Sequence, residues 1–163
     1  PRRKPFEWFG RSLWRKLLFV VLVSVLVLGT LHVSFRFALD RVRTTHRELR
    51  IAAAYLGNGR FQKALDHYNE ALELDERKQE ALSGRGICLL YLGRYRDALA
   101  SYERLITFDH DNIYGWQGKA MTLDKLGRYD EALRAFDRVL EIEPGFRAVR
   151  RQRQQLMRKM NGE

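Results

Sequence analysis

The sequence has a single cysteine, Cys88, and lacks the short motifs that usually mark an enzyme. One cysteine excludes an internal disulfide and any zinc site built from several cysteines. No glycine-rich phosphate loop and no nucleophile elbow is present. The histidines lie on different predicted elements, without a second metal ligand at a helical spacing that repeats a known site. They are His32, His46, His67 and His110. We therefore expect no catalysis, no cofactor, no metal and no small-molecule substrate, with Cys88 a small buried residue.

Charged residues are absent from residues 17–35, which read LLFVVLVSVLVLGTLHVSF. At about 1.5 Å per helical residue, this stretch spans roughly 28 Å, close to the hydrocarbon thickness of a bilayer. Ser24 and Thr30 can return their hydroxyls to the helix backbone. Aromatic and basic residues flank both ends, including Trp8 and Trp14 within the segment 1–16. We expect residues 17–35 to form a single transmembrane helix that makes this an integral membrane protein.

Two alternatives to a membrane helix fit the sequence less well. A cleaved signal peptide has a shorter apolar region and a cleavage site of small residues, which is missing here. A buried core helix would show a polar face, and residues 17–35 have none. The orientation stays undetermined, because six Lys or Arg precede the segment and five follow within fifteen residues.

The net charge of +10 belongs to the two ends of the chain. Residues 1–44 carry nine basic and two acidic residues, and residues 147–163 carry six and one. Residues 45–146 are close to neutral, with fifteen basic and seventeen acidic residues. Basic ends suit anionic lipid or an acidic protein surface. We expect no nucleic-acid binding, because no aromatic residue is interleaved with the C-terminal arginines to stack on bases.

Beyond residue 44 the sequence repeats itself at a fixed period, without insertions between the units. The repeated anchor is glycine, arginine and an aromatic residue, starting at Gly59, Gly93 and Gly127. An alanine follows three residues after each aromatic, and a second aromatic follows four residues later. These positions are Ala64, Ala98 and Ala132, then Tyr68, Tyr102 and Phe136. The repeat units are residues 45–78, 79–112 and 113–146.

Each unit predicts a hairpin of two helices. The glycine ends the first helix, because glycine adopts a left-handed backbone conformation at low cost. Small residues at the eighth place, Ala52, Gly86 and Ala120, let the two helices approach closely. The aromatic residues of the second helix are expected to fill the space between successive hairpins.

These residues resemble the tetratricopeptide repeat family over the whole of residues 45–146. The third unit matches the family pattern best, through Trp116, Gly127, Tyr129, Ala132, Phe136 and Pro144. Glu76 and His110 replace the closing proline in the first two units. The resemblance implies an all-α fold class: a single transmembrane helix followed by an α-solenoid of three helical hairpins and a C-terminal capping helix. It also implies a protein-binding scaffold.

The segments around the repeats are expected to be helical as well. Residues 36–44 are a linker, and the capping-box pattern at Thr45 and Glu48 predicts a break in the helix just before the first unit. Residues 147–163 form a basic capping helix. Its apolar side is expected to face the last unit through Val149, Leu156, Met157 and Met160. Its polar side is expected to face water through Arg150, Arg151, Arg153, Gln154, Arg158 and Lys159.

The resemblance places a partner-binding groove on the first helices of the units. Its predicted residues are Leu49, Ala53, Leu56, Ile87, Leu90, Tyr91, Tyr114, Gln117, Met121 and Lys125. An apolar strip of this kind usually marks an interface, although packing within the hairpins could half-bury some of these side chains. Family members that hold a chaperone's C-terminal carboxylate use Lys, Asn and Arg at five of these places. Here the five are apolar or neutral, so no such clamp is expected.

The layout of one membrane helix followed by three repeats is similar to cyanobacterial and plastid assembly factors of photosystem I. It is similar, less closely, to anchored periplasmic factors of cytochrome c maturation and secretion quality control. We expect an assembly factor that holds a membrane-complex subunit at a bacterial inner membrane or a thylakoid-type membrane. The alternative is a permanent small subunit of a large membrane complex. A mitochondrial import receptor is disfavoured by the arginine bias and the small size.

Overall fold

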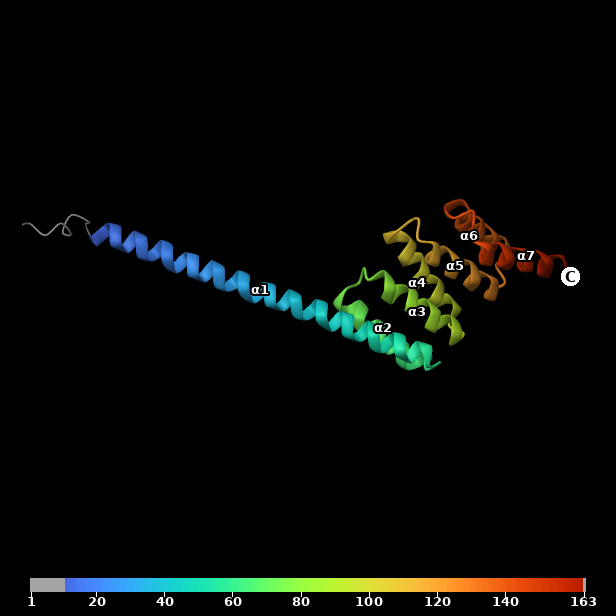
Figure 1. The fold of residues 1–163 in the computed structure, drawn as a ribbon, viewed down its shortest axis with the longest axis horizontal. Coiled ribbons are helices and arrows are strands. Elements are labelled where there is room, and N and C mark those ends of the chain that lie inside the picture. The colour runs from blue at the N-terminus through green and yellow to red at the C-terminus, as the bar shows by residue number, and fades with distance from the viewer. Residues whose placement is uncertain (1–10, 163) are drawn as a thin grey trace, which may run out of the picture. The chain divides into compact units, whose positions relative to one another are not determined.

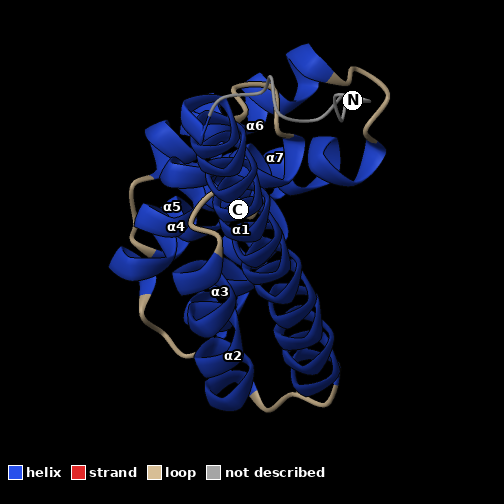
Figure 2. Ribbon diagram, turned by 90° about the vertical axis from the view of Figure 1, so that its left-hand side faces the viewer, coloured by secondary structure: helices blue, strands red, loops and turns tan. Residues whose placement is uncertain are grey.

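The computed structural model describes residues 11–162, and every regular element in that range is a helix (Figure 2). The chain divides into two compact units, residues 1–42 and 43–163. Residues predicted as membrane-flanking anchors before Arg11, such as Trp8, lie outside the described part. In chain order (Figure 1) the helices are α1 (Arg11–Gly57), α2 (Phe61–Leu74), α3 (Gln79–Tyr91), α4 (Tyr95–Phe108), α5 (Ile113–Lys125), α6 (Tyr129–Ile142) and α7 (Arg147–Asn161). The predicted all-α fold class is confirmed.

The described part of the first unit is the stretch of α1 formed by residues 11–42. Its large apolar side chains from Trp14 to Phe37 are exposed. The Ser24 hydroxyl donates to the Val20 carbonyl at 2.8 Å, and the Thr30 hydroxyl donates to the Val27 carbonyl at 2.8 Å, as expected. Among the described residues, this helix is long and apolar enough to cross a membrane, with a mean hydropathy of 2.5 in its most apolar window.

The helix break expected before Thr45 is absent. Residues 36–44 are helical, as expected of the linker, but α1 runs on without a break to Gly57. Thr45 and Glu48 are buried side chains within this helix, so neither serves as an N-terminal cap. Two physical reasons account for the difference. No proline or glycine interrupts residues 31–56, and the Glu48 carboxylate is engaged by Arg47 and His67.

In the second unit each helix packs against its neighbours in sequence, from α2 to α7, and α3 also contacts α5. Gly59, Gly93 and Gly127 have φ of 69°, 74° and 74°, which confirms the predicted left-handed ends of the first helices. At the turn between α3 and α4, the Gly93 amide donates to the Leu90 carbonyl at 3.2 Å and the Arg94 amide donates to the Leu89 carbonyl at 2.8 Å. These bonds satisfy carbonyls that the helix end leaves free.

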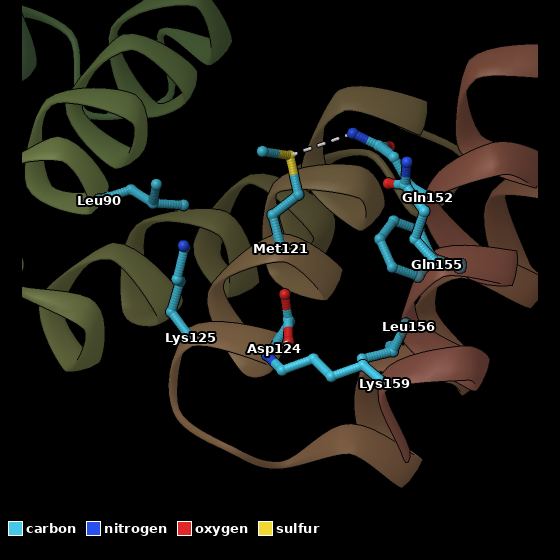
Figure 3. Close-up of a pocket in the computed structure, with 9 residues that line it drawn as sticks. Leu90, Met121, Asp124, Lys125, Gln152, Gln155, Leu156 and Lys159 are labelled. Atoms are coloured by element: carbon cyan, nitrogen blue, oxygen red, sulfur yellow. Dashed lines mark hydrogen bonds and ion pairs between the residues drawn. The ribbon is translucent and has the colours of Figure 1, made fainter. Parts of the chain in front are cut away.

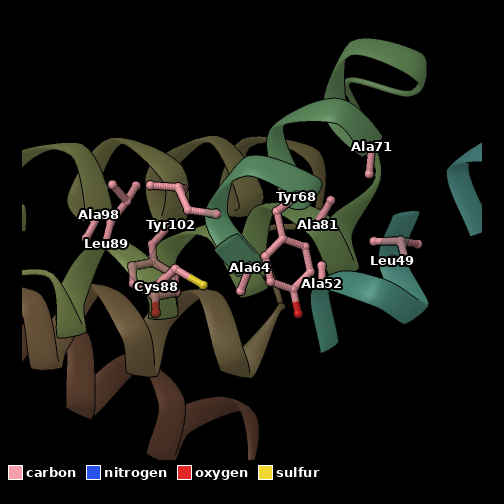
Figure 4. Packing of buried hydrophobic residues seen from close by; sticks show 11 residues of the cluster. Leu49, Ala52, Ala64, Tyr68, Ala71, Ala81, Cys88, Leu89, Ala98 and Tyr102 are labelled. Carbon is pink, nitrogen blue, oxygen red and sulfur yellow. The ribbon is translucent and has the colours of Figure 1, made fainter. Parts of the chain in front are cut away.

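The core forms where the sequence places small residues and aromatic rings together. The alanines at the eighth place of a repeat, and those three residues after the aromatic of the glycine–arginine–aromatic anchor, are fully buried. They are Ala52, Ala64, Ala98, Ala120 and Ala132. Tyr68, Tyr102 and Phe136 are also buried, and Figure 4 shows Tyr68 and Tyr102 among the side chains of the first core cluster. The Tyr102 ring lies against both Gly86 and Gly118, where a β-carbon would collide with it. Glycine therefore makes room for the ring that joins successive hairpins.

Helix α7 covers the last hairpin through two side chains. Val149 and Leu156 are buried, as predicted. Met157 and Met160, predicted to face the hairpin, are instead 40% exposed. Arg153, predicted to face water, is half-buried because its guanidinium donates to a carboxylate on α6. The contact face of α7 is thus narrower and more polar than its apolar residues alone predict.

Candidate functional site

Six of the predicted groove residues meet in one hollow between α3 and α5. The hollow has a volume of about 250 Å³. The six are Ile87, Leu90 and Tyr91 from α3 with Tyr114, Gln117 and Met121 from α5. Ser83, Tyr102 and Gly118 complete the lining. We call this site the apolar hollow, because none of its lining residues carries a charge at neutral pH.

Two tyrosines stand out at the rim of the apolar hollow. Tyr91 is 65% exposed and Tyr114 is 63% exposed. The Tyr91 ring stacks on Phe61 of α2, with ring centres 4.5 Å apart and planes 3° apart. A stacked ring is held in a defined orientation before a ligand arrives, which lowers the entropy cost of binding. Exposed aromatic residues around an apolar depression are typical of protein-binding surfaces.

The floor of the apolar hollow is formed by Tyr102 of α4. Its ring is only 3% exposed, because it fits between glycines of α3 and α5. Burial raises the pKa of the Tyr102 phenol, so the group stays neutral at physiological pH. Ser83 and Gln117 add neutral hydrogen-bonding groups to the lining. The site therefore fits an apolar side chain with a few neutral polar contacts, rather than a charged group.

A second hollow, of about 270 Å³, adjoins the first between α5 and α7 (Figure 3). It shares Leu90 and Met121 with the apolar hollow, and its other lining residues are Asp124, Lys125, Phe136, Gln152, Gln155, Leu156 and Lys159. We call it the polar hollow. Lys159 Nζ and Asp124 Oδ1 pair at 2.7 Å. Lys125, a predicted groove residue, lies here and makes no ion pair with any residue that the structure describes.

Helix α7 is thus a wall of the groove, which the sequence analysis missed. The Gln117 amide donates to Gln152 Oε1 at 3.0 Å, and Gln152 Nε2 lies 4.0 Å from the Met121 sulfur. The signal was present in the repeat period. Gln155 follows Met121 by one full repeat length, so α7 occupies the place of a further first helix.

Three predicted groove residues do not line either hollow. Leu49 is 5% exposed and belongs to the core cluster with Ala52, and Leu56 is half-buried against the same cluster. Ala53 is exposed on α1. Leu49 and Leu56 face inward because they pack against the side chains of α2, whose Ala64 belongs to the same cluster. The candidate site is therefore centred on α3, α5 and α7.

A polar cluster that spacing did not reveal joins α1 to α2. His67 Nδ1 lies 2.8 Å from Glu48 Oε2 and 3.6 Å from Glu70 Oε2. Arg47 donates to the other Glu48 oxygen at 2.8 and 3.0 Å, and this contact is the main cause of a lowered Glu48 pKa. One potential metal-ligating atom from each of Glu48, His67 and Glu70 lies within 4.8 Å of the other two. These three side chains could hold a divalent ion in place of the His67–Glu48 hydrogen bond. As they stand, Arg47 and His67 already satisfy the buried carboxylate.

Other chemical candidates have structural explanations. Cys88 is fully buried, as expected, and burial raises the pKa of its thiol to about 11, so it is not a reactive thiolate. A shallow depression of about 520 Å³ lies along α5 and α6 and has several charged residues in its lining. Most of its charged side chains take part in ion pairs, as Arg138 does with Asp111 and Glu141.

Known protein families match the repeats of this chain, and solved structures match its fold. Models described as tetratricopeptide repeat match residues 49–112 and 113–146. The first such domain of Spaghetti (RPAP3), solved bound to an HSP90 peptide, is 15% identical with a TM-score of 0.70, covering 73% of this chain and 94% of that one. The Sgt2 domain from Aspergillus fumigatus is 20% identical, with a TM-score of 0.68 and coverage of 72% and 79%. MamA from Desulfovibrio magneticus is 14% identical, with a TM-score of 0.68 and coverage of 72% and 66%. No curated protein matches the chain.

Proposed function

The chain belongs to the tetratricopeptide repeat family, and we propose that it is a membrane-anchored scaffold whose groove holds an apolar segment of a partner protein. The observation that carries the proposal is the apolar hollow between α3 and α5. It is uncharged, it has two exposed tyrosines at its rim, and it is large enough for a bulky side chain. An amphipathic helix or an extended apolar segment is the ligand that such a surface suits.

Similar structures support a peptide as the ligand. The first tetratricopeptide domain of RPAP3 is described as bound to an HSP90 peptide, and the second as in complex with an HSP70 peptide. Those peptides are the ligands of RPAP3. In this chain the places expected to clamp a chaperone carboxylate hold Leu49, Ala53, Ile87, Gln117 and Met121. The proposed ligand is therefore a different one, with an apolar side chain where a clamp would need a carboxylate.

The two adjoining hollows specify the ligand further. An apolar side chain in the apolar hollow would be followed, toward α7, by a polar or acidic group beside Lys125, Gln152 and Gln155. Lys125 has no ion pair within the described chain, so an acidic group can form a charge-assisted hydrogen bond with it without breaking an existing pair. The partner segment is thus proposed to be amphipathic along its length.

The long apolar part of α1 supports membrane attachment through residues 17–35. A groove for apolar segments beside a bilayer suits a factor that holds a membrane-complex subunit before it is assembled. A transient assembly factor is the favoured form of this proposal, and a permanent small subunit is the alternative. No comparison names a photosystem assembly factor, so the proposal is not tied to photosynthesis.

Site-specific photo-cross-linking tests the groove. A photoreactive amino acid at Tyr114 of the full chain should cross-link one partner in native membranes. Met121→Glu should lower the cross-link yield at least tenfold, because a carboxylate would be desolvated against an apolar ligand. Met157→Glu is the matched control, since Met157 is about equally exposed (40% against 37%) but lies outside both hollows.

Both variants should keep the thermal melt of the unsubstituted chain. An equal loss of cross-linking in Met121→Glu and Met157→Glu, or no loss in either, would mean that the partner uses another face. Salt-stable co-purification in a fixed ratio would favour a permanent subunit over a transient factor.

A further inference from the structure

Helix α7 carries a row of arginines that packing does not explain. Arg147, Arg151 and Arg158 are all exposed. Spacings of four and seven residues place them on one face of the helix, over about 16 Å of its length. That face is opposite the buried Val149 and Leu156. We call Arg147, Arg151 and Arg158 the arginine row.

The other cations of α7 have partners, and the arginine row has none among the described residues. Arg153 pairs with Asp137, and Lys159 pairs with Asp124. Arg150 donates to the Pro144 carbonyl at 2.6 Å. No acidic residue lies within α7, so the row has no counter-charge on its own helix. The cations that fix α7 to the repeats are therefore distinct from those that face outward.

The stability of the helix does not account for the row either. The first turn of α7 contains no acidic residue, as in α2 and α5, whereas those of α3, α4 and α6 each contain Asp or Glu. Among α2 to α7, only α7 begins with a basic residue, Arg147. A cation at a helix N-terminus interacts unfavourably with the helix dipole. Acidic residues would have kept this end soluble and favoured the helix as well. The choice of arginine points to an anionic ligand.

The row also lies on the helix that follows the third repeat. In the first helices of the units, the eighth place is small and buried under a second helix, as at Gly86 and Ala120. In α7 the corresponding residue is Gln154, which is exposed beside the row. Within the described residues, Gln154 and the arginine row therefore share one exposed face of α7.

We propose that Arg147, Arg151 and Arg158 dock the outer face of α7 on the anionic headgroups of a membrane. Arginine forms paired hydrogen bonds with phosphate, which headgroups present in a dense layer. A lipid surface is favoured over an acidic protein because the chain's own apolar helix would keep a bilayer at high effective concentration. This step rests on the membrane attachment proposed above, but not on the groove.

The test uses the full chain reconstituted into vesicles, with an environment-sensitive fluorophore on Gln154→Cys in a Cys88→Ala background. Vesicles of phosphatidylcholine alone are compared with vesicles in which about a third of the lipid is phosphatidylglycerol. The label should shift to the emission of a headgroup environment only in the anionic vesicles, and the shift should fall as salt is raised. Each of the single variants should lower the docked-to-undocked ratio roughly fivefold; they are Arg147→Gln, Arg151→Gln and Arg158→Gln. The triple row variant, which combines the three substitutions, should lose the shift.

The control for net charge replaces one exposed arginine in each of the three repeats with glutamine. These residues are Arg50, Arg96 and Arg134. This variant should keep the shift. The proposal is overturned if phosphatidylglycerol leaves the label unchanged, or if the control variant loses the shift equally. If the label does not respond to lipid, and the triple row variant fails to bind a protein or nucleic acid that the unsubstituted chain binds, the row would be assigned to that partner instead. Failure of the chain to float with any vesicle would refute the membrane attachment, and groove cross-linking would still report on the groove.

Discussion

At the scale of single residues, Tyr102 joins the fold to the candidate site. Its ring is packed against glycines of two different repeats, Gly86 and Gly118, and the same ring forms the floor of the apolar hollow. A β-carbon at Gly86 would approach the ring to 2.6 Å, and one at Gly118 would also overlap it. The space for one aromatic side chain therefore fixes the distance between α3 and α5, and with it the width of the hollow.

We predict that Gly118→Ala destabilises the protein by about 1–3 kcal/mol, because the added methyl group overpacks a filled core. The thermal melt of the full chain in detergent micelles, followed by helical circular dichroism, measures the effect. Gly145→Ala is the matched control, since a β-carbon at Gly145 meets no atom within 4 Å. Equal melting temperatures for the two variants would show that Tyr102 can move aside without cost.

At the scale of the elements, α1 is held to α2 by more than apolar contacts. The buried Glu48 carboxylate of α1 bonds to His67 of α2, and the His67 ring stacks on Tyr55 with ring centres 5.5 Å apart. Arg47 also donates to Glu48, and with His67 it lowers the Glu48 pKa below its ordinary value of 4.5. A group whose folded-state pKa is depressed stabilises the fold above the unfolded-state pKa. This contribution is lost as the pH falls through the lower folded-state value.

We predict that Glu48→Gln lowers stability at pH 7 by about 1–3 kcal/mol, because a buried network loses its charged acceptor. The deficit should shrink as the pH falls below about 4.5, where the unsubstituted chain loses the same contribution. Melts of the full chain in detergent between pH 3 and pH 7 test both statements. Glu70→Gln serves as the control, because that carboxylate is 56% exposed and should cost little. A deficit that stays constant over this pH range would contradict the linkage.

At the scale of the whole molecule, the two units bury their apolar side chains differently. Residues 43–163 enclose two core clusters of their own. The apolar residues of the first unit are exposed throughout, from Trp14 to Val42. Exposed apolar surface of this extent is unfavourable in water and favourable in hydrocarbon. This exposed surface supports the membrane attachment proposed above.

We predict that the full chain stays in the membrane pellet after extraction with alkaline carbonate. Peripheral proteins are released by this treatment, whereas a helix with its apolar side chains in hydrocarbon is retained. A chain lacking residues 1–42 should appear in the supernatant, which provides the control. Release of the full chain would rule out an integral anchor at residues 17–35.

The sequence alone determined the repeats and much of the groove. The constant repeat period predicted the hairpins, the left-handed glycines and the buried alanines, because each follows from local backbone and size requirements. The same register predicted six residues of the apolar hollow, from Ile87 to Met121. These features recur at the same place in each of the three repeats, so the residue type at each place is enough to identify them.

Only the tertiary structure decided which side chains leave the surface and which helices share a site. Leu49 fits the groove register, but it is buried because α2 supplies the apolar neighbours that pack against it. Glu48 and His67 lie 19 residues apart, so no local spacing rule predicts their bond. The polar hollow exists because α7 packs beside α5 and brings Gln152 to Gln117. Local rules specify the shape and periodicity of each hairpin, whereas contacts between hairpins depend on the summed packing of several helices.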